Sequence, residues 1–353
     1  MNLAYKLEHY AALRYRKRIQ KLSKKEKKIA SPSYILWDCT RRCNLHCEHC
    51  GATKETYRSE LSYEEIIKVV SDIAEMKIRM FSVTGGEPFM RKDLLNILGF
   101  AHSQGLKTGI ATNGFFIDKP IAQKIKDAGI DSIQISIDGL ERTHNTIRGN
   151  PQSFQRAIHA IRLLREAGIP LLSVATTLTQ TNYCELETLW KLLINLQVPT
   201  WRISVVMPIG RAETQERFLL NATQINHMFD FVATNSNPIP ILIAENLPFL
   251  AQYEERIRHE PLLCPVGITA CCLGVDGNIR GCPEQPDTPD FIEGNILETS
   301  LTDIWQHGFK KYRNNDILAH DEYCRNCTKK FYCFGGCHVM RIGNTHCIYN
   351  LIK

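Results

Sequence analysis

The chain has 353 residues, 44% of them hydrophobic and 23% charged, which is the composition of a globular protein with room for a large domain and a smaller one. No apolar run approaches the roughly 18–20 residues of a membrane span, and the N-terminus has no signal-peptide core, so we expect a cytoplasmic protein without a membrane span. The net charge is +6, but residues 1–30 carry ten Lys and Arg against two Glu, so the remaining residues sum to −2, which argues against nucleic acid as a partner.

Residues 1–30 are expected to form a separate basic N-terminal helix. Leu3, Leu7, Tyr10 and Leu13 recur near helical spacing, and Lys and Arg occupy most of the other faces. Two interpretations are open for this helix. It is either a solvated basic element, or it captures an acidic leader peptide or partner by electrostatic attraction.

Between residues 31 and 235, apolar segments alternate with helix-like segments, the pattern of a parallel α/β sheet. The expected strands are Tyr34–Asp38, Met80–Thr84, Thr108–Ala111, Ser132–Ile137, Leu171–Thr177 and Arg202–Val206. Expected helices include Tyr63–Met76, Lys92–Gln104 and Ser153–Ala167. This spacing of βα units is typical of a barrel or partial barrel, with its chemistry at the carboxyl ends of the strands, or of a doubly wound sheet.

Polar or glycine-bearing turns follow several of these strands. They include Thr84-Gly85-Gly86-Glu87-Pro88, Thr112-Asn113-Gly114 and Ser136-Ile137-Asp138-Gly139. Each turn alone has an ordinary explanation, since Gly, Asn and Asp tolerate the backbone conformations of turns. Their repetition at one edge of the expected sheet predicts a functional site there.

Fourteen cysteines in a chain without an export signal indicate metal binding or redox chemistry rather than disulfides. Cys43, Cys47 and Cys50 form a Cys-x3-Cys-x2-Cys loop directly after the first expected strand. Three thiolates at this spacing suit a cubane iron–sulfur cluster that leaves its fourth iron open. Structural zinc is the alternative, with Cys39 or His46 as a fourth ligand.

Together with the Gly-Gly-Glu-Pro motif and Ser136-Ile-Asp138-Gly, this loop makes residues 33–210 resemble the radical S-adenosylmethionine (SAM) superfamily. The resemblance implies a partial (β/α)6 TIM-like barrel over residues 31–235. It also implies that Cys43, Cys47 and Cys50 bind a 4Fe–4S cluster whose unique iron is chelated by SAM. Reductive cleavage of SAM would then yield a 5′-deoxyadenosyl radical that abstracts a hydrogen atom from the substrate.

The same resemblance assigns residues that contact SAM, through hydrogen bonds, charge or close backbone approach. They are Glu87 for the ammonium group, Gly85 and Gly86 for close approach, Ser136 and Arg148 for the carboxylate, Asn113 and Asp138 for the ribose or polar edge, and His49 beside the adenine. An ordinary surface pair of Asp138 and Arg148 is the alternative for those two residues.

A second block of cysteines begins at residue 264, and its part from Cys324 to Cys337 would by itself fit a structural zinc site. The whole series resembles the SPASM extension of radical SAM enzymes. This resemblance implies a SPASM domain at residues 260–353, joined to the barrel by a bridge at residues 236–259. It further implies two auxiliary 4Fe–4S clusters, which makes three clusters in the chain.

The SPASM resemblance also implies the auxiliary ligands. The first cluster would use Cys264, Cys282 and Cys337, with Cys271 or Cys272 as the fourth ligand, and the second would use Cys324, Cys327, Cys333 and Cys347. Cys271 fits the usual position better than Cys272, and without either thiolate the first cluster has an open iron. Cys39, Cys184 and the unused member of the pair are expected to be small buried hydrophobes.

For function, the resemblance implies a radical SAM oxidoreductase, and a maturase that cross-links or oxidises a ribosomally synthesised peptide is the first interpretation. Its partners would be the precursor peptide and an electron donor such as flavodoxin or ferredoxin. A haem or tetrapyrrole side-chain-modifying enzyme and an anaerobic sulfatase-type maturase are the alternatives. The last is disfavoured because Pro283, not an aspartate base, follows Cys282. A non-enzymatic metal-binding scaffold is disfavoured because the site motifs occur together, and no catalytic acid or base is assigned.

Overall fold

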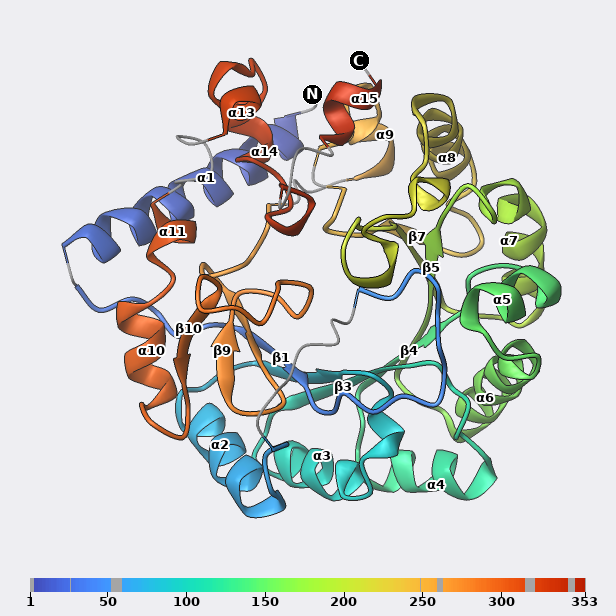
Figure 1. Cartoon of the computed structure of the whole chain (residues 1–353), viewed down its shortest axis with the longest axis horizontal. Coiled ribbons are helices and arrows are strands. Elements are labelled where there is room, and N and C mark those ends of the chain that lie inside the picture. Colours follow the sequence, from blue (N-terminus) through green and yellow to red (C-terminus); the bar gives the residue numbers. More distant parts are fainter. Residues whose placement is uncertain are drawn as a thin grey trace.

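One ten-stranded sheet organises the molecule, with its strands in the order β10-β9-β8-β1-β2-β3-β4-β5-β6-β7 (Figure 1). The structure is a computed structural model, and it describes residues 3–25, 27–51, 59–247, 249–258, 263–314, 321–341 and 347–352. No helix within these ranges is both long enough and apolar enough to cross a membrane.

Seven consecutive parallel strands form the larger part of the sheet. They are β1 (Tyr34–Asp38), β2 (Met80–Thr84), β3 (Lys107–Thr112), β4 (Ser132–Ser136), β5 (Leu171–Leu178), β6 (Thr200–Val205) and β7 (Ile241–Ile243). A doubly wound sheet reverses its strand order at a switch point, whereas here the spatial order follows the chain. The strand order therefore selects the partial barrel over the doubly wound sheet.

Helices cover the convex outer face of this curved sheet (Figure 1). They are α2 (Tyr63–Glu75), α3 (Leu94–Ser103), α4 (Lys119–Asp127), α5 (Glu141–Arg148), α6 (Ser153–Ala167), α7 (Leu186–Asn195) and α8 (Ala222–Thr234). Helix α2 shows why such segments form where they do. Ser62 and Glu65 close a capping box at its start, and its buried side chains, from Ile66 to Ile73, recur at helical spacing.

The C-terminal segment continues the same sheet at its other edge. Strand β8 (Ala270–Leu273) pairs in parallel with β1, and β9 (Asn278–Arg280) and β10 (Ile292–Asn295) follow as antiparallel strands. The remaining short helices are α9 (Glu254–Ile257), α10 (Leu301–His307), α11 (Lys310–Arg313), α13 (Glu322–Asn326), α14 (Lys330–Cys333) and α15 (Ile348–Ile352). Single 3-10 turns lie at η1 (Pro88–Met90), η2 (Tyr183–Glu185), η3 (Gly210–Ala212), η4 (Glu216–Phe218), η5 (Ala251–Tyr253) and η6 (Val339–Arg341).

All six strands expected from the sequence are present, with boundaries that differ by at most two residues. The segment expected to be a bridge, residues 236–259, contains β7, which hydrogen-bonds to β6 and extends the barrel sheet. This strand has three residues, too few to produce a periodic signal in the sequence. The barrel sheet and the C-terminal strands are therefore continuous through β1 and β8.

The N-terminal helix α1 (Leu3–Lys24) forms as expected, but Leu7 and Tyr10, which recur near helical spacing, do not lie on its packed face. Leu7 is 59% exposed and Tyr10 is 60% exposed. The face that packs against the protein instead carries His9, Arg16 and Ile19. The helix is thus not merely solvated, because one of its faces is buried against the C-terminal segment.

Candidate functional site

The polar turns expected to share one edge of the sheet do so. Strands β1 to β6 are parallel neighbours, so the loops that follow them emerge at the same edge. The loop after β1 holds Cys43, Cys47 and Cys50, and it faces the turns after β2, β3 and β4. The structure therefore brings the cysteine loop and the expected SAM-contacting residues together.

The cysteine loop is held by hydrogen bonds to three other loops. The amide of Cys39 donates to the carbonyl of Thr84 at the end of β2 (2.9 Å), and the amide of Glu48 donates to Ile147 in α5 (2.9 Å). From the loop after β6, Arg211 donates its Nε to the carbonyl of Cys47 (2.7 Å) and its amide to the carbonyl of Cys50 (3.0 Å). These contacts fix the backbone that carries the three thiols.

Gly85 and Gly86 allow this loop to lie directly on the end of β2. The amide of Gly86 donates to the carbonyl of Thr40 (2.6 Å), and the amide of Glu87 donates to that of Arg42 (2.8 Å). A Cβ at Gly86 would overlap the carbonyl oxygen of Arg42, and one at Gly85 would lie 2.5 Å from that of Thr40. The glycine pair therefore allows the backbone of the cysteine loop to approach the end of β2 closely.

The substitution Gly86→Ala is expected to reduce SAM cleavage about 100-fold, because its methyl group displaces the backbone next to Cys43. Deoxyadenosine formed under dithionite measures the effect. Gly99→Ala is the matched control, since a Cβ there meets nothing closer than 3.7 Å, and it should cleave SAM like the native protein. Equal activity of both variants would contradict this account of the glycine pair.

Glu87 is almost fully buried, and its carboxylate is occupied by donors of the protein itself. It accepts from the Thr112 hydroxyl (2.6 Å), the Asn113 amide (2.8 Å) and the Phe89 amide (3.2 Å). Burial raises its pKa although these hydrogen bonds oppose the shift. The side chain thus ties the end of β2 to the end of β3, and its contact with the SAM ammonium stays a prediction.

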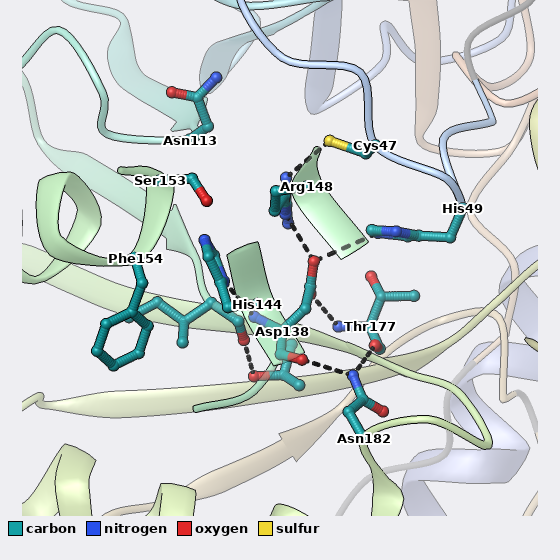
Figure 2. A network of polar contacts seen from close by, with 12 residues as sticks. Cys47, His49, Asn113, Asp138, His144, Arg148, Ser153, Phe154, Thr177 and Asn182 are labelled. Carbon is teal, nitrogen blue, oxygen red and sulfur yellow. Dashed lines mark hydrogen bonds and ion pairs between the residues drawn. The ribbon is translucent and has the colours of Figure 1, made fainter. Parts of the chain in front are cut away.

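Asp138 and Arg148 form a buried pair beside the cysteine loop (Figure 2). Arg148 Nε donates to Asp138 Oδ2 (2.7 Å), while its Nη1 donates to the sulfur of Cys47 (3.7 Å). On the other side of the carboxylate, His49 Nε2 lies 3.4 Å from the same oxygen, and the amide of Thr177 donates to Asp138 Oδ1 (2.9 Å). The alternative of an ordinary surface pair is therefore wrong, because Asp138 is 0% exposed.

The pKa values in this network indicate that Asp138 and Arg148 are charged, whereas His49 and His144 are neutral. Burial opposes ionisation of Asp138, but Arg148 and the two histidines lower its net pKa. Burial lowers the pKa of His49 to about 4 and that of His144 to about 3. His144 is accordingly neutral, and its Nδ1 accepts from the amide of Asp138 (3.0 Å). The sequence did not single out His144, which lies in α5 with no motif around it.

The other expected SAM contacts lie around this pair. Asn113 donates its Nδ2 to the side chain of Asn44 in the cysteine loop (2.9 Å), and its Oδ1 accepts from the Phe115 amide (2.9 Å). Ser136 is half-buried and ends β4, two residues before Asp138. These residues lie at the same sheet edge as the cysteine loop, and their contacts with SAM stay predictions.

The cysteines expected at the first auxiliary cluster are partly brought together. The thiol of Cys282 interacts electrostatically with Cys337 and Cys264, and burial raises the pKa of all three thiols. Cys271 and Cys272 face opposite sides of β8, because neighbouring residues in a strand alternate. The electrostatic partners of Cys271 are Cys272 and Arg313, with none of the other three thiols among them. The expected role of Cys271 as fourth ligand thus stays a prediction that these contacts do not support.

The cysteines expected at the second auxiliary cluster share one cavity. Cys324, Cys327, Cys333 and Cys347 are among its lining residues, together with Cys337 of the first set. Asp321 caps the short helix α13 by accepting from the amide of Cys324 (2.8 Å). Within the described ranges, no group of three or more His, Cys, Asp or Glu side chains is arranged so that it could hold a single metal ion.

The cysteines left without a ligand role behave differently from one another. Cys39 is fully buried in the hydrophobic core, as expected. Cys184 is exposed in η2, so the expectation that it is a buried hydrophobe is wrong. A lone cysteine in a sequence does not reveal its own exposure, which depends here on the loop between β5 and α7.

A network of buried charges links the two cysteine regions, and sequence reasoning missed it. Asp38, at the end of β1, contacts Arg41 (3.1 Å) and Arg280 of β9 (3.5 Å). Asp287 lies 3.7 Å from Arg41 and 3.9 Å from Arg280. All four side chains are at most 13% exposed. Residues 242 positions apart thus share one network, which only the pairing of β8 with β1 brings about.

Glu284 is a second residue whose importance emerges only from the structure. A Cβ at Gly51 would overlap Oε2 of Glu284, so this carboxyl group reaches the residue that follows Cys50. Its own backbone lies two residues after Cys282, and burial raises its pKa. A single half-buried side chain therefore spans the space between the first cysteine loop and the first auxiliary set.

The fold and these cysteine loops define an α/β barrel protein whose strand ends are built to hold iron–sulfur clusters. In agreement with this class, the sequence matches the radical SAM superfamily over residues 37–193 and the SPASM iron-sulfur cluster-binding domain over residues 264–328. The chain thus contains a radical SAM domain and a C-terminal SPASM domain. Both the fold class and the family expected from the sequence are confirmed, and SAM and 4Fe–4S clusters are its implied cofactors.

Similar proteins include one named for haem synthesis and one named for peptide cyclisation. The AdoMet-dependent heme synthase of Oleidesulfovibrio alaskensis is 29% identical over 328 residues, which cover 86% of this chain and 82% of that protein. The PqqA peptide cyclase of Rhizobium meliloti is 29% identical over 319 residues, covering 88% and 83%. The structure of Streptococcus suis SuiB bound to precursor peptide SuiA matches with a TM-score of 0.71 at 17% identity, covering 92% and 75%, and shows a shared fold.

Proposed function

We propose that this chain is a radical SAM/SPASM oxidoreductase that oxidises a side chain of an iron tetrapyrrole in haem formation. The observation that carries the proposal is the similarity to the AdoMet-dependent heme synthase, which spans 86% of this chain and 82% of that protein. A match of this extent includes the barrel, the SPASM domain and the segment between them. Further relatives named as AdoMet-dependent heme synthase or Fe-coproporphyrin III synthase move the tetrapyrrole ahead of the peptide that the sequence first indicated.

The cluster ligands are part of the same proposal. Cys43, Cys47 and Cys50 hold the SAM-binding cluster, and Cys324, Cys327, Cys333 and Cys347 hold the second auxiliary cluster. Cys264, Cys282 and Cys337 hold the first auxiliary cluster. The shared cavity of the second set and the mutual interactions of the first set support these assignments, because thiolates are the ligands that such clusters require.

The chain's own residues have separable tasks in this reaction. When bound, SAM and its cluster supply a 5′-deoxyadenosyl radical that takes a hydrogen atom from the substrate. Gly86 and Arg211 hold the backbone of the cysteine loop through hydrogen bonds. Arg148, which is paired with Asp138, donates to the sulfur of Cys47. Glu284 reaches from the loop of Cys282 to Gly51, directly after the first cysteine loop, and we assign it to the substrate side of the site.

An oxidative outcome is supported by this arrangement. Hydrogen abstraction leaves a substrate radical, which becomes a closed-shell product after giving up one more electron. Glu284, two residues after Cys282, reaches Gly51 directly after the first cysteine loop, which supports placing the SAM site and the first auxiliary site near each other. An auxiliary cluster held there would accept the electron that an oxidation releases.

The proposal is tested with the anaerobically reconstituted protein, SAM, dithionite and iron coproporphyrin, an iron tetrapyrrole that carries propionate side chains. We expect mass spectrometry to detect an oxidised side chain, with one deoxyadenosine formed for each hydrogen atom removed. Native protein without SAM is the control. Deoxyadenosine formation with an unchanged tetrapyrrole would overturn the substrate assignment but not the radical chemistry.

A peptide substrate is the second candidate, because the PqqA peptide cyclase matches this chain at the same 29% identity and over a similar share of its length. The discriminating experiment replaces the tetrapyrrole by short peptides encoded next to this gene. A cross-linked or oxidised peptide, at a rate that the tetrapyrrole does not reach, would make the protein a peptide maturase.

A further inference from the structure

Helix α1 is fixed to the SPASM domain through one face. The ring of His9 stacks on Tyr332 with centroids 5.2 Å apart, and Arg16 donates to the carbonyl of Cys264. The guanidinium of Arg16 also lies 5.6 Å from the ring centre of Phe334. Gln20 donates to the carbonyl of Asn314 (3.2 Å). The orientation of the helix is therefore defined, and its opposite face is turned to solvent.

The solvent-facing side of α1 combines cations with large apolar groups. Its exposed cations are Lys6, Arg14, Lys17, Arg18, Lys21 and Lys24, and none of them is paired with a carboxylate among the side chains that the structure describes. Leu7 and Tyr10 are also exposed, at 59% and 60%. Exposed aromatic and aliphatic groups within a field of one charge are typical of a binding surface for a protein of opposite charge.

This basic face lies directly behind the auxiliary cysteines. Tyr332, against which His9 stacks, precedes Cys333, and Arg16 contacts the backbone of Cys264. Figure 1 shows α1, α13 and α14 at the same end of the molecule. Tyr323 of α13, next to Cys324, is also 58% exposed. The helix that carries this surface therefore packs beside one cysteine of each auxiliary set, Cys264 and Cys333.

We propose that the outer face of α1 is the docking surface of an acidic one-electron carrier protein of the flavodoxin or ferredoxin class. The inference rests on the proposed oxidative function, which needs an exit for one electron. Loss of a hydrogen atom to the deoxyadenosyl radical leaves a substrate radical. That radical gives up one electron, together with a proton or CO2, and the electron passes through the auxiliary sites to the oxidised carrier, which is reduced by one electron.

The same charge would also attract an acidic leader peptide, but the position of the surface favours the carrier. An electron carrier has to dock close to a redox site, and α1 packs on residues next to Cys264 and Cys333. A leader peptide has no such requirement. Because His9, Arg16 and Ile19 are buried, deletion of the helix would disturb the SPASM domain, so the test uses the full chain with altered surface charges.

The test variant is K17E/R18E/K21E, in which three exposed cations of α1 are reversed. The matched control is K119E/K124E/K126E, the same charge change on exposed positions of α4, which lies on the far side of the molecule (Figure 1). Binding of the reconstituted holoprotein to purified flavodoxin and to purified ferredoxin, both acidic, is measured by calorimetry between about 25 and 300 mM NaCl.

We expect native protein and the α4 variant to bind one of the carriers with an affinity that falls as salt rises, and the α1 variant to bind it about tenfold more weakly at low salt. Electron transfer from the photoreduced holoprotein to that carrier should slow in parallel, while SAM cleavage with dithionite stays unchanged. Equal binding by both variants, or no binding of either carrier to the native protein, would overturn the proposal. The proposal would also be overturned if the α1 variant bound the carriers like native protein and lost only its binding to an acidic peptide. Tetrapyrrole oxidation with dithionite is scored separately, so failure of the proposed function is distinguishable.

Discussion

Replacement of Cys43, Cys47 and Cys50 together by Ala is expected to abolish SAM cleavage while the auxiliary clusters persist. SAM binds a cluster through an open iron, and these three cysteines are the proposed ligands of that cluster, in a loop of their own. The auxiliary cysteines lie on separate elements, from Cys264 to Cys347, and five of them line one cavity. Loss of the first cluster therefore leaves the residues of the other two in place.

The measurement combines deoxyadenosine formation with iron and sulfide content. Native protein should hold about twelve iron atoms in three cubanes, and the triple variant about eight, with no deoxyadenosine above background. Cys184→Ala is the matched control, because Cys184 is exposed and belongs to none of the proposed ligand sets, and it should keep both values. Retained deoxyadenosine in the triple variant would refute the division of tasks, and a native content near four iron would refute the auxiliary clusters.

Asp138→Ala is expected to destabilise the fold by about 3–5 kcal/mol, the second large effect. Asp138 is fully buried, and its removal leaves the buried guanidinium of Arg148 without its partner at 2.7 Å. It also removes the acceptor of the Thr177 amide and the neighbour of His49. Since Arg148 contacts the sulfur of Cys47, SAM cleavage should fall together with stability.

Urea denaturation under anaerobic conditions measures the first effect, and deoxyadenosine formation measures the second. Asp230→Ala is the control, because Asp230 and Arg256 form an exposed pair at 3.8 Å, whose loss should change the free energy of unfolding by less than about 1 kcal/mol. If Asp138→Ala unfolds and cleaves SAM like this control, the buried network is not what holds Arg148 beside the cysteine loop.

Several features of this protein were determined by the sequence alone. The expected strands of the barrel were found within two residues, because buried parallel strands produce short apolar runs between turn residues. The cysteine loop and Gly85-Gly86-Glu87-Pro88 were recognisable because their spacing is local. The family followed from their order along the chain, and the match over residues 37–193 confirms it.

Other features depended on contacts between residues that are distant in the chain. The choice of barrel over doubly wound sheet required the strand order, which a sequence pattern does not contain. The face of α1 that is buried did not follow from the sequence, since the SPASM domain accepts His9 and Arg16 through stacking and a backbone carbonyl. Amphipathic patterns register hydrophobicity and miss such polar packing.

The same contrast between local motifs and long-range contacts applies to the residues at the site. Glu87 and Asp138 belong to local motifs, so the sequence found them, but their hydrogen bonds to Thr112, Asn113 and Arg148 were decided by the closeness of β2, β3 and α5. Glu284 had no motif of its own. Its place next to Gly51 exists only because β8 pairs with β1 and carries the loop of Cys282 to the carboxyl ends of the barrel strands. Local spacing determined which residues bear the chemistry, and the pairing of distant strands decided which of them meet.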